Sequence, residues 1–204
     1  DRGGVTWKDF GVRVEERRAR CVAAGVRQGD VVVAPGEAAL ESLEWLFALS
    51  SVGAVAAPLR RERLGELAVW RGHLRLNWAV KDDGLVAMDE GAVTVRASEL
   101  LGQLRQRGHA GLILATSGTT GTAKLILHDL DNLLGAIPVR TARGWRTLPL
   151  MRFDHVGGLD MAFRALGSGQ VLVAPPGELS PEAVAEVVAR QRVEVMPATP
   201  SFLN

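Results

Sequence analysis

The chain has 204 residues, of which 47% are hydrophobic, and this is enough for a sizeable buried core. Its net charge is +1, from 24 basic and 23 acidic side chains mixed along the sequence, which excludes an electrostatic footprint for nucleic acid or an anionic membrane. No apolar run approaches the roughly 18 residues of a membrane span, and the N-terminus lacks a signal-peptide pattern, so we expect a cytoplasmic location.

The first eighty residues alternate predicted helices with short apolar strands. Residues 5–24 carry apolar side chains at helical spacing, and Gly25 ends this helix. Cys21, the only cysteine, falls on the apolar face, so we expect a packed thiol and neither a disulfide nor a cysteine-based metal site. Further helices are predicted at about 37–52 and 62–72, between short apolar runs typical of buried parallel strands at 31–34, 54–57 and 76–80.

The rest of the chain continues this alternation. A small hairpin is framed by turns at 82–84 and 90–91, and a helix near 98–107 follows. Two apolar runs, 112–115 and 125–127, read as strands. Beyond them we expect helices at 129–142, about 156–166 and 181–192, and strands at 147–150, 170–174 and 193–196. The fold class is therefore α/β, a layered α/β/α arrangement with a mainly parallel sheet.

The segment between the two central apolar runs consists almost entirely of hydroxyl and glycine residues and ends in a lysine. Gly118 and Gly121 permit the tight turns that aim successive N–H groups at one anion, and Lys124 supplies a mobile positive charge. The segment predicts a polyphosphate-binding loop made of Thr116, Ser117, Gly118, Thr119, Thr120, Gly121, Thr122 and Lys124.

This loop is not a Walker loop, because that pattern places four residues between its glycines and Ser or Thr after the lysine. Here two residues separate the glycines and Leu125 follows Lys124. The alternative is an ordinary Ser/Thr/Gly surface loop. Lysine is rare among the basic residues of this chain, which favours a function for the one that closes the loop.

Residues 116–124 resemble the signature loop of the adenylate-forming superfamily, T-S-G-T-T-G-x-P-K-G, which includes acyl-CoA synthetases, aryl-CoA ligases and peptide-synthetase adenylation domains. The chain departs from it at Ala123, where proline is usual, and at Leu125, where glycine is usual. These departures affect the stiffness of the loop and leave the phosphate ligands in place. Further similar segments at 4–7, 29–33, 52–59, 149–159, 166–169 and 195–203 follow the family order through nearly the whole chain.

One of these segments adds a second candidate site. In the family, the residue that matches His155 lies beside the carboxylate and the acyl pocket, so the resemblance implies that His155 orients substrate or gates that pocket. Gly157 and Gly158 would then allow substrate to approach the backbone closely. The alternative is a turn histidine bonded to nearby backbone, followed by two turn glycines.

The resemblance implies activation of a carboxylic acid by ATP and capture of the acyl-adenylate by the thiol of coenzyme A or a carrier-protein pantetheine. The family's ligands for Mg²⁺ and its catalytic lysine lie after the segment that matches Asn204, so we expect no metal ligands within residues 1–204. We therefore expect the chain to be the N-terminal subdomain of an acid-CoA ligase, inactive by itself. The alternatives are a peptide-synthetase-type adenylation domain and a catalytically inert nucleotide-binding or interaction module.

Overall fold

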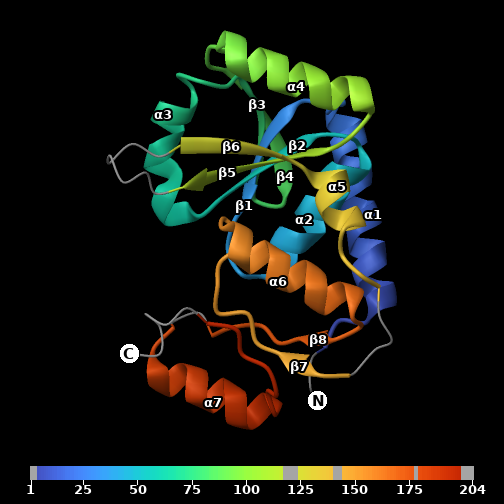
Figure 1. The fold of residues 1–204 in the computed structure, drawn as a ribbon, viewed down its shortest axis with the longest axis vertical. Coiled ribbons are helices and arrows are strands. Elements are labelled where there is room, and N and C mark those ends of the chain that lie inside the picture. Colours follow the sequence, from blue (N-terminus) through green and yellow to red (C-terminus); the bar gives the residue numbers. More distant parts are fainter. Residues whose placement is uncertain (1–3, 117–123, 140–143, 177–178, 199–204) are drawn as a thin grey trace.

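A computed structural model describes residues 4–116, 124–139, 144–176 and 179–198 (Figure 1). Its centre is a six-stranded sheet in the order β4-β3-β1-β2-β5-β6. The four inner strands are parallel, and β4 and β6 pair antiparallel at the two edges. The strands are β1 (Val31–Pro35), β2 (Val55–Leu59), β3 (Leu76–Lys81), β4 (Gly84–Glu90), β5 (Gly111–Thr116) and β6 (Lys124–Asp129). The predicted α/β class with a mainly parallel sheet is confirmed.

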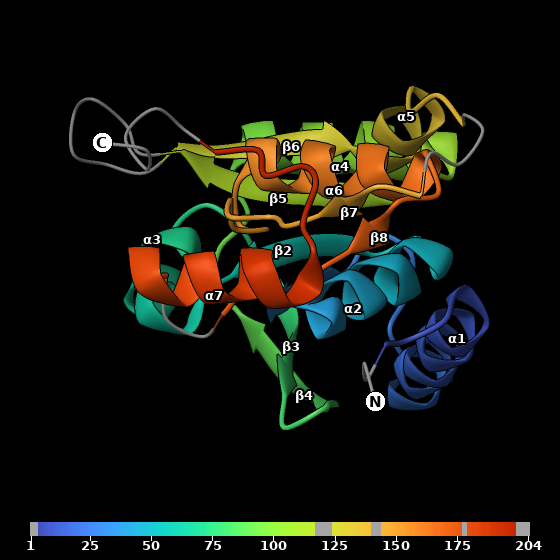
Figure 2. The ribbon, with the colours of Figure 1, turned by 90° about the horizontal axis from the view of Figure 1, so that it is seen from below.

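Helices cover both faces of this sheet. The helices are α1 (Trp7–Ala24), α2 (Leu40–Ser51), the 3₁₀ helix η1 (Arg61–Glu66), α3 (Leu67–Trp70), α4 (Val95–Arg107), α5 (Leu130–Gly135), α6 (Val156–Gly167) and α7 (Pro181–Gln191). The last of them, α7, packs in a separate apolar cluster with Leu148, Leu150 and Val173. A short second sheet joins β7 (Arg146–Thr147) to β8 (Val171–Leu172) and lies between α6 and α7 in Figures 1 and 2.

The period-two pattern of the strands explains the two main apolar clusters. One face of the sheet packs against α1, α2, α5 and α6, and the other packs against α3 and α4. On β1, Val32 faces the first cluster and Val33 faces the second. Because both faces are covered, the inner strands read as continuous apolar runs in the sequence.

Aromatic rings connect the helices on the first face. The Phe47 ring lies edge-on to Phe10 of α1, with centroids 5.9 Å apart, and to Phe163 of α6, at 6.1 Å. Cys21, farther along α1, is fully buried in the same apolar cluster, and burial raises the pKa of its thiol to about 11. The expectation of a packed thiol is confirmed. No helix in the described part of the chain is long and apolar enough to cross a membrane.

Two predicted helices differ from the structure. The helix expected at 129–142 ends at Gly135, because Pro138 disfavours helical geometry in the residue before it and cannot donate an N–H bond. The helix expected at 62–72 begins as a 3₁₀ helix and becomes α-helical only at Leu67. The segment expected as a small hairpin between two turns is a single strand, β4. It forms a hairpin with β3 around Asp82 and Asp83, which both have positive φ angles.

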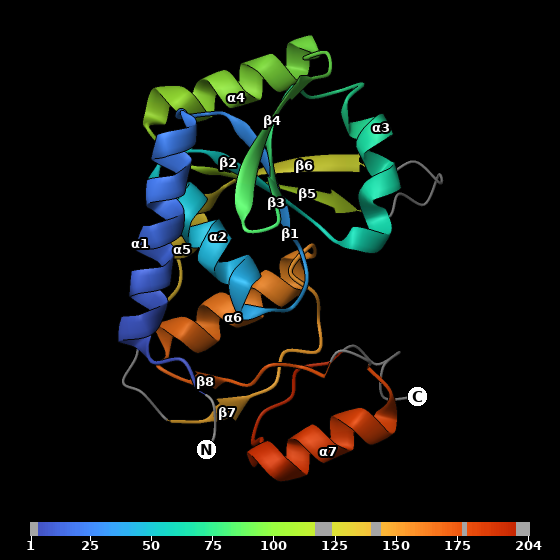
Figure 3. The ribbon, with the colours of Figure 1, turned by 180° about the vertical axis from the view of Figure 1, so that it is seen from behind.

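A buried carboxylate joins α1 to α2, which run alongside each other in Figure 3. Glu44 is 1% exposed. Its carboxylate forms an ion pair with Arg17 at 2.8 Å and a longer one with Arg13 at 3.5 Å. Arg17 also pairs with Asp83 at 3.1 Å and lies 5.5 Å from the ring centroid of Trp45. Arg17 therefore joins α1 both to α2 and to the hairpin turn.

We predict that Glu44→Ala lowers the free energy of unfolding by about 3–5 kcal/mol, because it leaves the buried Arg17 without its main counter-charge. Urea denaturation measures this loss. The matched control is Glu15→Ala, which removes an exposed pair with Arg18 and is expected to cost at most about 1 kcal/mol. Equal losses in the two variants would contradict the proposed role of Glu44.

Candidate functional site

The carboxyl edge of the parallel sheet gathers the predicted site. Because β1, β2 and β5 run in the same direction, they end at one edge, at Pro35, Leu59 and Thr116. Ligand sites in open α/β sheets lie at this edge. The loop-forming end of the β5–β6 hairpin is therefore at the position where this architecture binds ligands.

The two ends of the predicted phosphate loop are well defined. Thr116 and Lys124 are the last register pair of the hairpin, and the Thr116 hydroxyl donates to the Lys124 carbonyl oxygen at 3.4 Å. Lys124 is exposed. The two strands predicted on either side of the loop are confirmed. The remaining predicted ligands lie outside the described residues: Ser117, Gly118, Thr119, Thr120, Gly121 and Thr122.

The segment that carries His155 docks onto the same edge. The backbone N–H groups of Phe153 and Asp154 both donate to the carbonyl oxygen of Gly36, each at 3.1 Å, directly after β1. A Cβ atom at Gly36 would lie 2.9 Å from the backbone nitrogen of Leu59 and 3.0 Å from the Asp154 side chain. Glycine at this position is what permits the approach. In Figure 1 the start of α6 and the arrowhead of β5 lie on the same side of the molecule.

A buried ion cluster fixes this docked segment. The Asp154 side chain is 3% exposed, and its Oδ2 accepts from Arg60 Nε at 2.9 Å and Arg63 Nη1 at 2.8 Å. Hydrogen bonding to Glu66, and then to Asp154, raises the pKa of Arg63. Sequence analysis missed this cluster. The signal was present, since a basic turn follows the second buried strand directly and an aspartate precedes His155.

His155 occupies the N-cap position of α6 with an extended backbone, and its side chain makes no capping hydrogen bond. The residue is exposed. It therefore lies at the carboxyl edge with its imidazole available to a ligand, beside the rigidly held Asp154. The role of His155 toward substrate stays a prediction.

The two glycines of α6 have a structural explanation in the fold. A Cβ atom at Gly158 would lie 2.1 Å from the carbonyl oxygen of Arg152, and one at Gly157 would lie 3.3 Å from the sulfur of Met151. The close approach at Gly158 is thus made by the protein's own backbone. The expected contact of these glycines with substrate stays a prediction.

We predict that Gly158→Ala lowers the free energy of unfolding by about 2 kcal/mol, because the added methyl group clashes with a carbonyl oxygen that cannot move independently. The matched control is Gly102→Ala in α4, where a Cβ atom meets nothing within 4 Å. That control should stabilise the protein by about 0.5–1 kcal/mol through helix propensity. Thermal denaturation distinguishes these opposite signs, and equal behaviour would refute the packing argument.

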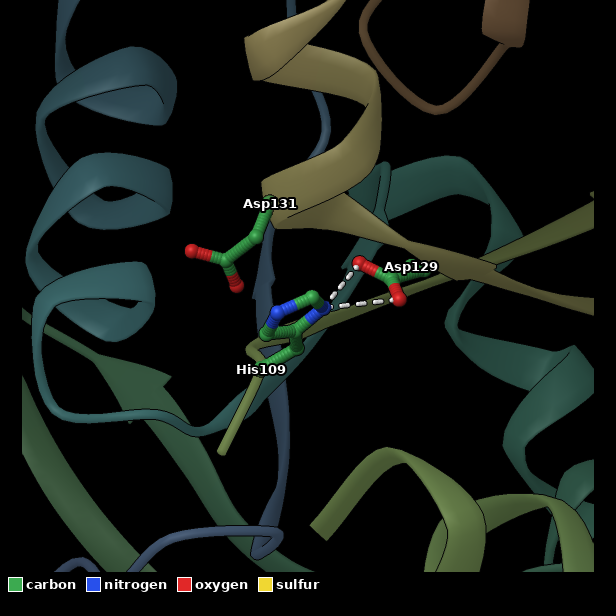
Figure 4. A group of neighbouring side chains, drawn as sticks. All are labelled: His109, Asp129 and Asp131. Atoms are coloured by element: carbon green, nitrogen blue, oxygen red, sulfur yellow. Dashed lines mark hydrogen bonds and ion pairs between the residues drawn. The ribbon is translucent and has the colours of Figure 1, made fainter. Parts of the chain in front are cut away.

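A second polar cluster lies at the other end of the β5–β6 hairpin. His109 Nδ1 lies 3.0 and 2.9 Å from the two carboxylate oxygens of Asp129, and Figure 4 shows Asp131 on the opposite side of the ring. Burial raises the pKa of Asp129, but bonds from His109 and the Asn132 N–H outweigh it and hold that pKa below its usual value. Asp131 accepts the N–H of Ala110. The cluster joins the start of β5 to the start of α5.

This cluster does not fit the Mg²⁺ that adenylate-forming enzymes use. Within the described ranges, His109, Asp129 and Asp131 are the one group of three His, Cys or acidic side chains close enough to share a metal ion. They lie beyond Gly111, roughly 17 Å along β5 from Thr116 at a strand rise of about 3.3 Å. Asp129 is also committed as the N-cap of α5. No step of the chemistry is therefore assigned to a metal at this position.

Burial lowers the pKa of His128, which lies on β6. The unfolded chain therefore binds a proton at higher pH than the folded protein, so the stabilising contribution of neutral His128 is present above about pH 6.5 and is lost as the pH falls. We predict that His128→Gln weakens the fall in stability between about pH 7.5 and 5. Urea midpoints across this range measure it. The wild-type protein measured in parallel is the reference, and an unchanged slope in His128→Gln would contradict the prediction.

The family described as AMP-binding enzyme matches residues 77–204, more than half of the chain. The chain therefore belongs to this family of adenylate-forming enzymes. Among curated proteins, the hybrid PKS-NRPS synthetase apdA of Emericella nidulans is 27% identical over 207 residues. That alignment covers 92% of this chain and 5% of the synthetase.

Solved structures share the fold. The N-terminal domain of FACL13 from Mycobacterium tuberculosis has a TM-score of 0.72 at 20% identity, over 98% of this chain and 57% of that one. The N-terminal subdomain of NpsA from Klebsiella oxytoca has a TM-score of 0.70 at 19% identity, over 94% of this chain and 55% of that one. The third structure is the o-succinylbenzoate CoA synthetase MenE of Bacillus subtilis, in complex with its acyl-adenylate intermediate. Its TM-score is 0.68 at 19% identity, over 98% of this chain and 57% of that one. The chain thus spans just over half of these structures.

Proposed function

We propose that this chain carries the polyphosphate-binding half of the site in an enzyme that activates a carboxylic acid with ATP and transfers the acyl group to a thiol. One observation carries the proposal. In a chain of the AMP-binding family, the two ends of the signature loop and the His155 segment lie at the same carboxyl edge of one sheet. Nucleotide and acid would then meet along that edge.

The proposed chemistry assigns the loop to the leaving group. A carboxylate attacks the α-phosphorus of ATP, the bond to the β-phosphate oxygen breaks, and negative charge builds on the departing pyrophosphate. Backbone N–H groups, hydroxyls and the ammonium of Lys124, aimed at those oxygens, would stabilise this charge as it develops. His155, held in place by its neighbour Asp154, would contact the acid.

The extent of the chain bears on this proposal. Its solved relatives are nearly twice as long, and MenE holds its acyl-adenylate within such a longer chain. We propose that residues 1–204 form an N-terminal subdomain, and that later segments complete the adenine, ribose and Mg²⁺ contacts and supply the catalytic lysine. A cytoplasmic location follows from this proposal, since ATP and coenzyme A are available there.

The acyl acceptor defines two candidates. Coenzyme A is the first, supported by the likeness to MenE, a CoA synthetase. A carrier-protein pantetheine is the second, favoured by the likeness to a PKS-NRPS synthetase and to an artificially fused NpsA-ThdA adenylation-PCP di-domain. Incubation of the full gene product with ATP, an acid and either acceptor distinguishes them, because only the true acceptor yields a thioester.

We predict that Lys124→Ala reduces carboxylate-dependent ATP–pyrophosphate exchange of the full gene product by about 100-fold or more, the loss expected when a charge-stabilising group is removed. The assay uses a panel of aliphatic and aromatic acids. Lys8→Ala on α1 is the matched control and should stay within about twofold of wild type. A Lys124→Ala enzyme with nearly normal exchange would end the loop assignment. Absence of exchange with every acid would favour the inert-module alternative.

A further inference from the structure

A cavity of about 540 Å³ lies between α4 and the sheet, on the face opposite α1, α2 and α6. Small-molecule sites typically have volumes of about 300–1,000 Å³ and mostly apolar walls. The lining residues come from α4, both hairpin strands and the turn between α3 and β3. They are His73, Leu74, Thr94, Arg96, Ala97, Leu100, Leu101, Ile113, Lys124, Leu125 and Leu127.

The floor of the cavity is a continuous apolar surface. Ile113 and Leu127 are register partners on β5 and β6, so their side chains share one face of the sheet. Leu125 precedes Leu127 by two residues on β6 and therefore lies on the same face. From above, α4 contributes Leu100 and Leu101. The walls therefore suit an alkyl or aryl group.

The polar lining residues gather at one end. The chain passes from α4 through a short turn into β5, so the start of α4 lies over the carboxyl end of β5, where β6 begins at Lys124. Figure 1 shows this arrangement, with the start of α4, the arrowhead of β5 and α3 on the same side of the molecule. Thr94 and Arg96 occupy the first turn of α4, and the N–H of Thr94 donates to the carbonyl oxygen of His73.

Two cations thus line the polar end of an otherwise apolar cavity, and the first turn of α4 adds the positive end of a helix dipole. A wholly apolar ligand would leave this end unpaired, whereas a dianion would gain nothing from the apolar floor. We infer that the cavity binds an amphipathic monoanion, an alkyl or aryl carboxylate, with its carboxylate toward Arg96 and Lys124 and its apolar body over Ile113, Leu125 and Leu127. This inference is argued from the cavity and shares one residue, Lys124, with the proposed function.

Isothermal titration calorimetry of the protein with hexanoate, octanoate and decanoate tests the inference. Each added methylene is expected to tighten Kd about fourfold until the apolar walls are covered. Octanol, which lacks the charge, should bind more weakly than octanoate. Arg96→Gln should weaken octanoate binding about two- to fivefold, as for an exposed ion pair, and leave octanol binding unchanged.

A matched pair of variants locates the binding. Leu100→Trp places an indole in the cavity and should abolish binding of all three acids. Val95→Trp places the same indole on the same helix at a residue that is 78% exposed and outside the lining, and should bind as wild type does. Circular dichroism confirms that both variants are folded. The inference is overturned by no binding at millimolar acid, by affinity independent of chain length, or by equal binding in the two variants. The last result would assign the acid to a different site.

Discussion

One carbonyl oxygen fixes the segment before His155 to the end of β1. Gly36, directly after the first strand, accepts N–H bonds from both Phe153 and Asp154. The bonds form only because Gly36 has no side chain, since a methyl group there would meet the backbone of Leu59. A segment from late in the sequence is thereby fixed to a strand from early in it. The relation of His155 to the phosphate-loop ends depends on this contact.

Charge strengthens the same junction. The carboxylate of Asp154 is removed from water, which is tolerable because two guanidinium groups from the turn after β2 bind one of its oxygens. The pattern resembles that at Glu44, where buried Arg17 joins two helices and a hairpin turn. In both places a single acidic side chain joins segments that are distant in the chain. Such groups specify geometry more than they add stability.

The sequence could predict most elements and the main site because their signals are local. Apolar runs marked the strands, Gly25 and Ser180 marked helix ends, and the nine-residue loop stood out by composition. The helix at 129–142 was predicted too long, because apolar periodicity outweighed the warning from Pro138. The Asp154 cluster left only a weak signal, a basic turn after β2 and an aspartate before His155, and the pairing itself joins residues distant in the chain. The cavity beneath α4 was missed for the same reason: its walls come from four separate segments.

The chain of rings from Phe10 through Phe47 to Phe163 has a consequence for synthesis. Phe47 of α2 packs on Phe10 of α1 and also on Phe163 of α6, which is synthesised much later. Until then the phenyl groups of α1 and α2 lack their third partner, and the nascent chain exposes their apolar surface. The ring contact between α2 and α6 therefore cannot form before residue 163 has been synthesised.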